Sequence, residues 1–204
     1  MSEDLQKLLD QEQIRDVRRR WAYGRDLQEW DLLRSVFHTD ATVHVSWFKG
    51  PATEFVQRSS ELAKLIKPGE HNRHSFGNMR TLVRGNRAIQ ETDIQVLVRA
   101  FIEGILFDNT TWGRFYDRFE KRDGRWKILQ MTCIYEKDRL DPVVPGSVPP
   151  SFYEGLKLNE PGFECAFLKF RLAKLGRQGI PVVLSRSEDE KKLRAAAEQW
   201  LVEG

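Results

Sequence analysis

Residues 93–102 read Asp-Ile-Gln-Val-Leu-Val-Arg-Ala-Phe-Ile, in which every second residue is apolar from Ile94 to Ile102. A period of two is typical of a β-strand, whose side chains point alternately to the two faces of a sheet. Neighbouring segments share this pattern, and turn residues separate them. Asp123-Gly124 is a strong hairpin signal. The sequence therefore predicts four consecutive antiparallel strands, at 74–84, about 93–102, about 110–120 and 126–135.

The pattern before residue 74 is mostly helical. Three apolar sets recur at helical spacing, and they are Ile14-Val17-Trp21, Trp30-Leu33-Phe37 and Phe55-Leu62-Ile66. We expect Asp10 and Gln13 to form a capping box at the start of the first helix and Gly24 to end it. A short strand, 41–48, separates the second and third helices. Helices segregated from an antiparallel sheet predict the α+β class, and a curled sheet would enclose a pocket with them.

The chain changes character after residue 138. Four prolines fall within nine positions, Pro142, Pro145, Pro149 and Pro150, and predict an extended connector. A short helix ending at Gly176 should follow, and then a last helix capped by Ser187 and Glu190. Since this part has too few apolar residues for its own core, we expect residues 1–138 to form one domain and 139–204 a helical arm. The arm would pack on the body or on a neighbouring subunit, as a lid or as an interface element.

Composition excludes several classes of protein. The 204 residues hold 33 Lys and Arg against 30 Asp and Glu, a net charge of +3, which argues against nucleic acid as the main partner. The basic run Arg18-Arg19-Arg20 is expected to be a solvated helix face. No apolar run is long enough to span a membrane, and the acidic N-terminus does not resemble a signal peptide. With only Cys133 and Cys165, a reduced, cytoplasmic setting is expected.

Few groups remain that could carry chemistry. Phosphate-binding glycine loops and a Gly-x-Ser-x-Gly elbow are absent from the sequence. His71 and His74 are three apart on a predicted strand and would point to opposite faces, so neither a metal nor a cofactor is expected. Asp26, at a helix boundary, and His74, at a strand start, are the remaining candidates. Each also fits a structural role, Asp26 as a helix cap and His74 as a core histidine, and spacing alone does not bring them together.

Several short motifs, taken in order, carry a family resemblance. They are Tyr23-Gly24-Arg25-Asp26-Leu27-Gln28-Glu29-Trp30-Asp31 with Leu33 and Phe37, then Asp40-Ala41-Thr42-Val43, Phe48-Lys49-Gly50-Pro51, His74 with Asn78, and the strand and hairpin at 113–128. Together they resemble the SnoaL-like dehydratases of the nuclear transport factor 2-like superfamily, over roughly residues 5–137. The resemblance implies a cone-shaped, cystatin-like α+β fold, with three N-terminal helices on a curved antiparallel sheet.

The resemblance also implies a catalytic pair. The family's Asp–His dyad falls on Asp26 and His74, with the histidine as general base and the aspartate holding its tautomer. The family's assisting tyrosine has no direct match, because Trp21 and Arg25 occupy the corresponding positions. Other candidates for substrate binding are Tyr23, Arg25, His44, Asn78, Met131 and Tyr135, of which Asn78 shares the strand face of His74 if the period of two continues.

These observations lead to one hypothesis with two alternatives. The first is a cofactor-independent, dehydratase-like lyase acting on a cyclic or polycyclic apolar small molecule. The second is an isomerase or polyketide-type cyclase in the same pocket. The third is a non-catalytic scaffold or ligand-binding protein, like the β subunit of a ring-hydroxylating dioxygenase, because a fold alone does not establish catalysis. The resemblance also implies a homo-oligomer, a dimer or a trimer.

Overall fold

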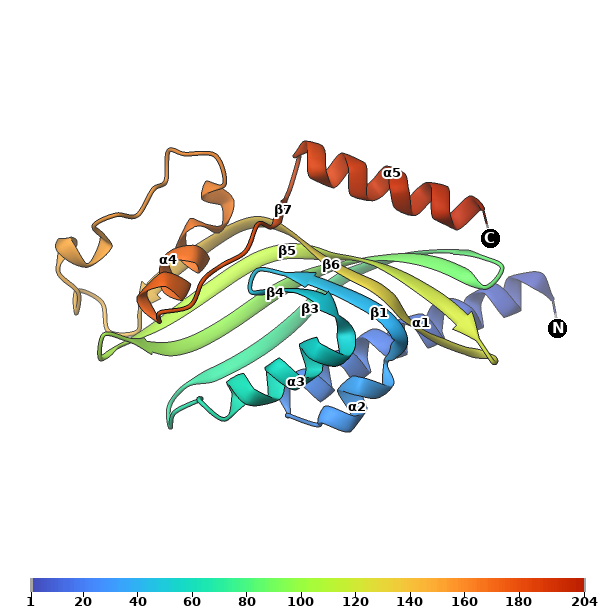
Figure 1. The fold of residues 1–204 in the computed structure, drawn as a ribbon, viewed down its shortest axis with the longest axis horizontal. Coiled ribbons are helices and arrows are strands. Elements are labelled where there is room, and N and C mark those ends of the chain that lie inside the picture. Colours follow the sequence, from blue (N-terminus) through green and yellow to red (C-terminus); the bar gives the residue numbers. More distant parts are fainter. Residues whose placement is uncertain (1, 204) are drawn as a thin grey trace.

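The computed structural model describes residues 2–203, and these form a long curved sheet with helices on both sides (Figure 1). The helices are α1 (Glu3–Asp26), α2 (Trp30–Ser35), α3 (Ala52–Ala63), α4 (Ala166–Lys174) and α5 (Glu188–Val202). The strands are β1 (Phe37–Val45), β2 (Phe48–Pro51), β3 (His71–Arg84), β4 (Arg87–Ile102), β5 (Ile105–Arg122), β6 (Arg125–Pro142) and β7 (Val183–Leu184). Short 3₁₀ turns lie at Pro150–Tyr153 and Phe163–Cys165.

The predicted antiparallel strands are present, and they form one sheet in the order β2-β1-β6-β5-β4-β3. The hairpin between β5 and β6 turns at Asp123 and Gly124, whose φ angles of 50° and 74° suit the turn expected from this dipeptide. β1 joins the sheet parallel to β6, and the short β7 pairs with β6 as well. The prediction of an α+β fold with helices on a curved, mainly antiparallel sheet is confirmed.

The start of α1 differs from the prediction. The helix begins at Glu3, where the side chain of Ser2 accepts a hydrogen bond from the Leu5 backbone N–H, and it continues to Asp26. Asp10 is therefore no cap: it lies inside the helix, is buried, and accepts hydrogen bonds from Lys121 Nζ at 2.8 Å and Trp126 Nε1 at 2.7 Å. A buried carboxylate needs such partners. These partners come from the distant β5–β6 hairpin, which local sequence does not indicate.

Gly24 does not end α1 but lets α2 approach it closely. A Cβ atom at this position would lie 2.7 Å from the Leu33 backbone nitrogen. The contact holds the last turn of α1, which carries Asp26, against α2. Glycine is required here for the close approach of two backbones rather than for its φ angle.

Replacing Gly24 by alanine is expected to lower the free energy of unfolding by about 1–3 kcal/mol, because the added methyl group must push two backbones apart. Urea unfolding of Gly24→Ala checks this. Gly179, whose φ is ordinary and whose added Cβ would meet its nearest atom, Leu172 Cδ1, at 3.6 Å, offers a comparison for the effect of volume alone. If Gly24→Ala has wild-type stability, the α1–α2 contact is looser than described.

The helices divide between two faces of the sheet. α1, α2 and α3 lie on one face, and α5 lies across the other (Figure 1). The main core fills the space between the first three helices and the sheet, and includes Trp21, Leu33, Phe55 and Phe115. α4 contributes Leu168 and Leu172 to this same core. A smaller apolar cluster lies beneath α5, as expected for a sheet covered on both faces.

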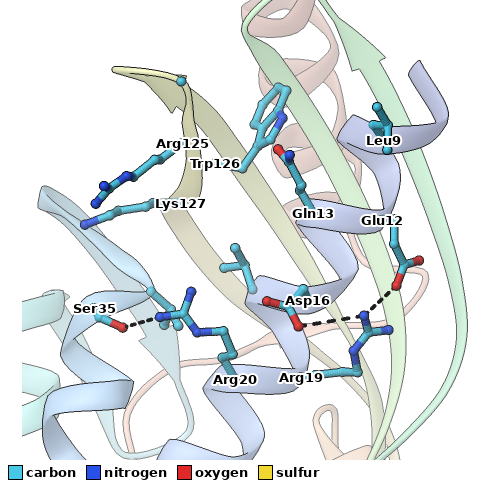
Figure 2. Close-up of a pocket in the computed structure, with 13 residues that line it drawn as sticks. Leu9, Glu12, Gln13, Asp16, Arg19, Arg20, Ser35, Arg125, Trp126 and Lys127 are labelled. Carbon is cyan, nitrogen blue, oxygen red and sulfur yellow. Dashed lines mark hydrogen bonds and ion pairs between the residues drawn. The ribbon is translucent and has the colours of Figure 1, made fainter. Parts of the chain in front are cut away.

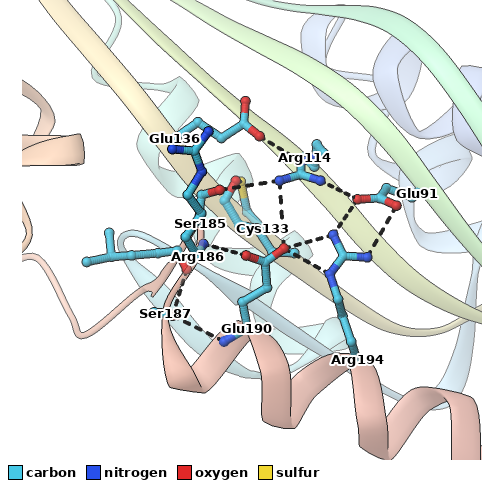
Figure 3. Close-up of polar contacts among 11 residues, drawn as sticks. Glu91, Arg114, Cys133, Glu136, Ser185, Arg186, Ser187, Glu190 and Arg194 are labelled. Atoms are coloured by element: carbon cyan, nitrogen blue, oxygen red, sulfur yellow. Dashed lines mark hydrogen bonds and ion pairs between the residues drawn. The ribbon is translucent and has the colours of Figure 1, made fainter.

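The C-terminal arm packs on the body of its own chain. Glu91, on the outer face of β4, binds Arg194 of α5 at 2.5 Å and Arg114 of β5 at 2.7 Å (Figure 3). The predicted cap of the last helix is present, since Ser187 Oγ accepts from the Glu190 backbone N–H at 3.1 Å. β7 extends the attachment by pairing with Ile134 and Tyr135. These contacts join residues far apart in sequence and hold α5 on the sheet.

Candidate active site

The structure brings Asp26 and His74 into contact. His74 Nδ1 lies 2.5 Å from Asp26 Oδ1, and the His74 backbone N–H donates to Asp26 Oδ2 at 2.8 Å. One carboxylate thus holds both the ring and the backbone of the histidine. Both side chains are mostly buried, with 11% of His74 and 16% of Asp26 exposed. This arrangement favours the tautomer in which Nδ1 carries a proton and Nε2 is available as a base.

Two elements position this pair. Asp26 is the last residue of α1, and His74 lies near the start of β3, opposite Val96 of β4. The Trp21 ring, five residues before Asp26 on the same helix, meets the imidazole edge-on with centroids 5.0 Å apart. The ring of His74 is therefore held by a carboxylate and by an aromatic ring.

The surroundings keep His74 uncharged at neutral pH. Burial lowers the pKa of His74 below its ordinary value of 6.5, and the positive charges of Arg25 and Arg18 act in the same direction. The Asp26 carboxylate opposes this shift, but burial outweighs it. A neutral imidazole at pH 7 is the form that can accept a proton.

We expect the NMR titration of His74 to have its midpoint below pH 6.5, and Asp26→Asn to lower it further, because the substitution removes the one interaction that raises the pKa. Since the pKa is lowered in the folded state, the contribution of His74 to stability is complete above pH 6.5 and falls as the pH drops below this value. The missing signal in His74→Ala assigns the resonance. A midpoint above 6.5 would contradict the described burial.

A buried ion pair lies beside the dyad. Arg18 of α1 binds Asp117 of β5, and both side chains are fully buried. The Arg18 guanidinium also lies over the rings of Trp21, Phe76 and Phe115, at 4.6–5.8 Å from their centroids. Burial raises the pKa of Asp117 to about 6 and lowers that of Arg18. The space next to His74 is therefore packed with aromatic rings around one ion pair.

Arg18 corrects the expectation that the whole basic run is solvated. Arg19 is exposed, but Arg18 falls four residues after Ile14 and one after Val17, on the buried side of α1. This spacing from two apolar residues is the feature of the sequence that indicates the burial of Arg18. Asp117 carried no comparable signal, because the inward direction of a strand residue depends on the register of the sheet.

The two candidates beside Asp26 point in different directions. Tyr23 is 61% exposed and lies away from the dyad core. Arg25 is half-buried, and burial lowers the pKa of its guanidinium although the Asp26 charge opposes the shift. Arg25 also lowers the pKa of His74, so its charge acts on the dyad. Of these two residues, only Arg25 belongs to the site electrostatically.

His44 and Asn78 form hydrogen bonds away from the dyad. His44 Nε2 contacts the Pro181 carbonyl at 2.8 Å, on the side of β1 opposite its buried valines. Asn78 is exposed and donates to Asp93 Oδ2 at 3.1 Å. The expectation that Asn78 shares the strand face of His74 is wrong, because a register shift between Phe76 and Met79 reverses the alternation.

Met131 and Tyr135 both lie in the main core on β6. Met131 Sδ is 3.6 Å from the Arg18 guanidinium, so it borders the buried ion pair. The Tyr135 hydroxyl accepts a hydrogen bond from the Ser46 backbone N–H at 2.8 Å, and burial raises its pKa well above 10.0. Tyr135 is therefore a neutral phenol tied to the edge of the sheet near the arm.

A cavity of about 570 Å³ lies between α1 and the β5–β6 hairpin (Figure 2), and Asp26 and His74 do not line it. No group of three or more His, Cys, Asp or Glu side chains within 2–203 has the arrangement of a metal site. None of the helices within that range is both long and apolar enough to cross a membrane.

Comparison with known proteins agrees with this fold. The family model of the SnoaL-like domain matches residues 6–132. Pea pathogenicity protein 2 of Fusarium vanettenii is 29% identical over 158 residues, which are 76% of this chain and 67% of that protein.

Two solved structures are similar in fold. LinA, a hexachlorocyclohexane dehydrochlorinase, superposes with a TM-score of 0.58 at 19% identity, covering 73% of this chain and 99% of its own. A putative scytalone dehydratase of Novosphingobium aromaticivorans superposes with a TM-score of 0.57 at 16% identity, covering 70% and 97%. With helices on a curved sheet and a family match over more than half of its length, the chain belongs to the SnoaL-like domain family.

Proposed function

We propose that this protein is a cofactor-independent lyase that eliminates water or halide from a cyclic, apolar small molecule. His74 is its general base, and Asp26 orients His74. The observation that carries the proposal is the double contact of one Asp26 carboxylate with the ring Nδ1 and the backbone N–H of His74. Such a contact leaves Nε2 as the only basic atom of the pair.

The proposed step needs no group beyond the side chains present. Nε2 of His74 takes a proton from a carbon next to the one that bears the leaving group. The electrons of that C–H bond form the new C=C bond as the leaving group departs. In a dehydration, the imidazolium returns its proton to the departing hydroxide, so that water is released. Asp26 stabilises the imidazolium while it exists.

Trp21 is the proposed partner for a substrate oxygen. Its side chain is 1% exposed, and its Nε1–H has no hydrogen-bond partner within residues 2–203. A buried N–H without a partner is rare in folded proteins and costs free energy. A carbonyl oxygen or a departing oxygen of the substrate would accept a hydrogen bond from this N–H. The Trp21 ring is close enough to the base for this, since its centroid lies 5.0 Å from that of the His74 ring. By the family resemblance, Trp21 stands at one of the two positions that match the assisting tyrosine, and like a tyrosine it can donate a hydrogen bond.

One observation favours the non-catalytic alternative. The space next to the dyad holds the rings of Trp21, Phe76 and Phe115 around the Arg18 guanidinium. A substrate would have to displace part of this packing. A scaffold protein with the same fold would keep it intact.

A substrate screen distinguishes the two. Purified protein is incubated with a panel of cyclic β-hydroxy ketones and chlorinated cyclohexanes, and products with a new C=C bond are identified by mass spectrometry. A lyase gives turnover that is lost in His74→Ala. Ligand binding without turnover, unchanged in His74→Ala, would favour the scaffold. Isomerised product of unchanged mass would favour the isomerase.

A further inference from the structure

A hollow lies between α1 and the β5–β6 hairpin, and we call it the hairpin cavity. It measures about 570 Å³, within the range of small-molecule sites. Its walls come from α1, from the α2–β1 junction and from the first residues of β6 (Figure 2). A second cavity of about 400 Å³ at the hairpin shares Arg125 and Lys127 with it.

The hairpin cavity carries an excess of unneutralised positive charge. Within residues 2–203, Arg20, Arg125 and Lys127 form no ion pair, and Arg20 donates only to Ser35 Oγ at 2.9 Å. The acids of the cavity are Glu12 and Asp16, and both pair with Arg19. Three cations without an ion pair among the described residues thus line one hollow, Arg20 from α1 and Arg125 and Lys127 from β6 (Figure 2).

The hairpin explains why Lys127 stays free. Lys127 lies opposite Glu120 in the β5–β6 register. The Glu120 carboxylate, however, binds Arg122 at 2.6 Å, and Arg122 is held in turn by Asp40 at 2.8 Å. The acid that Lys127 would otherwise meet is therefore occupied. Asp123, at the hairpin turn, borders only the second cavity.

The other wall of the hairpin cavity is apolar. Leu9, Val17, Val36 and Trp126 line it, and of these four only Leu9 is exposed, at 41%. The Trp126 indole N–H is already bound to Asp10 at 2.7 Å and is not free to bind a ligand. An apolar wall facing a cationic rim suits a ligand with both characters.

We propose that the hairpin cavity binds a small amphipathic anion, with its phosphate or carboxylate between Arg20, Arg125 and Lys127 and its apolar body against Leu9. An anion would relieve the repulsion among the three cations and form charge-assisted hydrogen bonds with them. This site is separate from the proposed reaction at Asp26 and His74 and does not depend on it.

Calorimetric titration tests the proposal with octyl phosphate and octanoate as monomers, and with octanol and inorganic phosphate as partial probes. We expect saturable binding of one or both octyl anions, weaker binding of inorganic phosphate, and weaker binding of octanol. The stronger of the two anions identifies the head group. Affinity should fall as salt increases from 50 to 200 mM, since the contacts are screened charges.

Variants locate the site. R125Q/K127Q should weaken binding of the octyl anion by about tenfold, because it removes two charge-assisted contacts. K191Q/K192Q, the same charge change on α5, and His74→Ala should bind as the wild type does. Leu9→Ala should weaken the octyl anion but leave inorganic phosphate unchanged. The proposal is overturned if neither octyl anion saturates, if octanol binds as tightly, or if K191Q/K192Q weakens binding as much as R125Q/K127Q.

Discussion

His74→Ala is expected to lose about 10²–10⁴-fold of kcat for any elimination that the wild type catalyses, because it removes the only basic atom of the dyad. Since the imidazole also touches Trp21, a small change in KM is expected as well. His71→Ala is the matched control, because His71 lies three residues earlier on the same strand and is exposed. The measurement is steady-state kinetics with the substrate that the screen identifies.

Asp26→Asn distinguishes the role of Asp26 in the dyad from that of His74. An amide at this position keeps the volume but can no longer stabilise an imidazolium, so kcat should fall by about 10²-fold or more while KM changes little. The acidic limb of the kcat/KM profile should follow the pKa of His74, which is below 6.5, with activity lost as the pH falls through it. Equal activities of wild type and His74→Ala would exclude the dyad as the site of chemistry.

Arg18→Met is expected to lower the free energy of unfolding by about 3–5 kcal/mol at pH 8, the largest effect on stability foreseen for a single substitution here. Both Arg18 and Asp117 are fully buried, so methionine leaves a carboxylate without a partner in the core. Burial already raises the pKa of Asp117 to about 6, and loss of Arg18 raises it further. The loss should therefore be smaller at pH 5, where Asp117 is protonated in the variant.

Urea unfolding of the two single variants and of the double variant measures this coupling. Arg18→Met/Asp117→Leu should regain most of the stability lost in Arg18→Met, because two apolar groups replace a buried pair. Arg19→Met, one residue along the same helix but exposed, should change stability by no more than about 0.5 kcal/mol. If Arg18→Met and Arg18→Met/Asp117→Leu are equally unstable, the unpaired Asp117 carboxylate is not the cause of the stability lost in Arg18→Met.

The strands and the last helix could be predicted because their signals are local. The hairpin at Asp123 and Gly124 follows from backbone conformations that few residues adopt, and the Ser187 cap follows from a hydrogen bond made three residues away. Alternation along β4 and β5 follows from the geometry of a strand. Local rules do not depend on the rest of the chain, so the turn and the cap lie where predicted. The strands are longer than predicted, because β4 begins at Arg87 and β6 continues to Pro142, which the sequence placed in the connector.

The family motif indicated the pairing of Asp26 with His74, but spacing did not, since 48 residues separate them. The displaced face of Asn78 arises from a register shift between Phe76 and Met79, where β3 has one residue more than the facing part of β4. His44 contacts Pro181, and Asp10 contacts the β5–β6 hairpin. In both cases the partner is far away in the sequence.

Local periodicity and turn chemistry are thus readable along the chain, and they determine the helices, the strands and the α+β class. The partners of buried polar groups are not readable in this way. Arg18 is buried because Asp117 and three rings surround it, and all but one of those groups reach it from strands. A charge is tolerated in a core only when such partners are present together, and only the folded sheet brings them together.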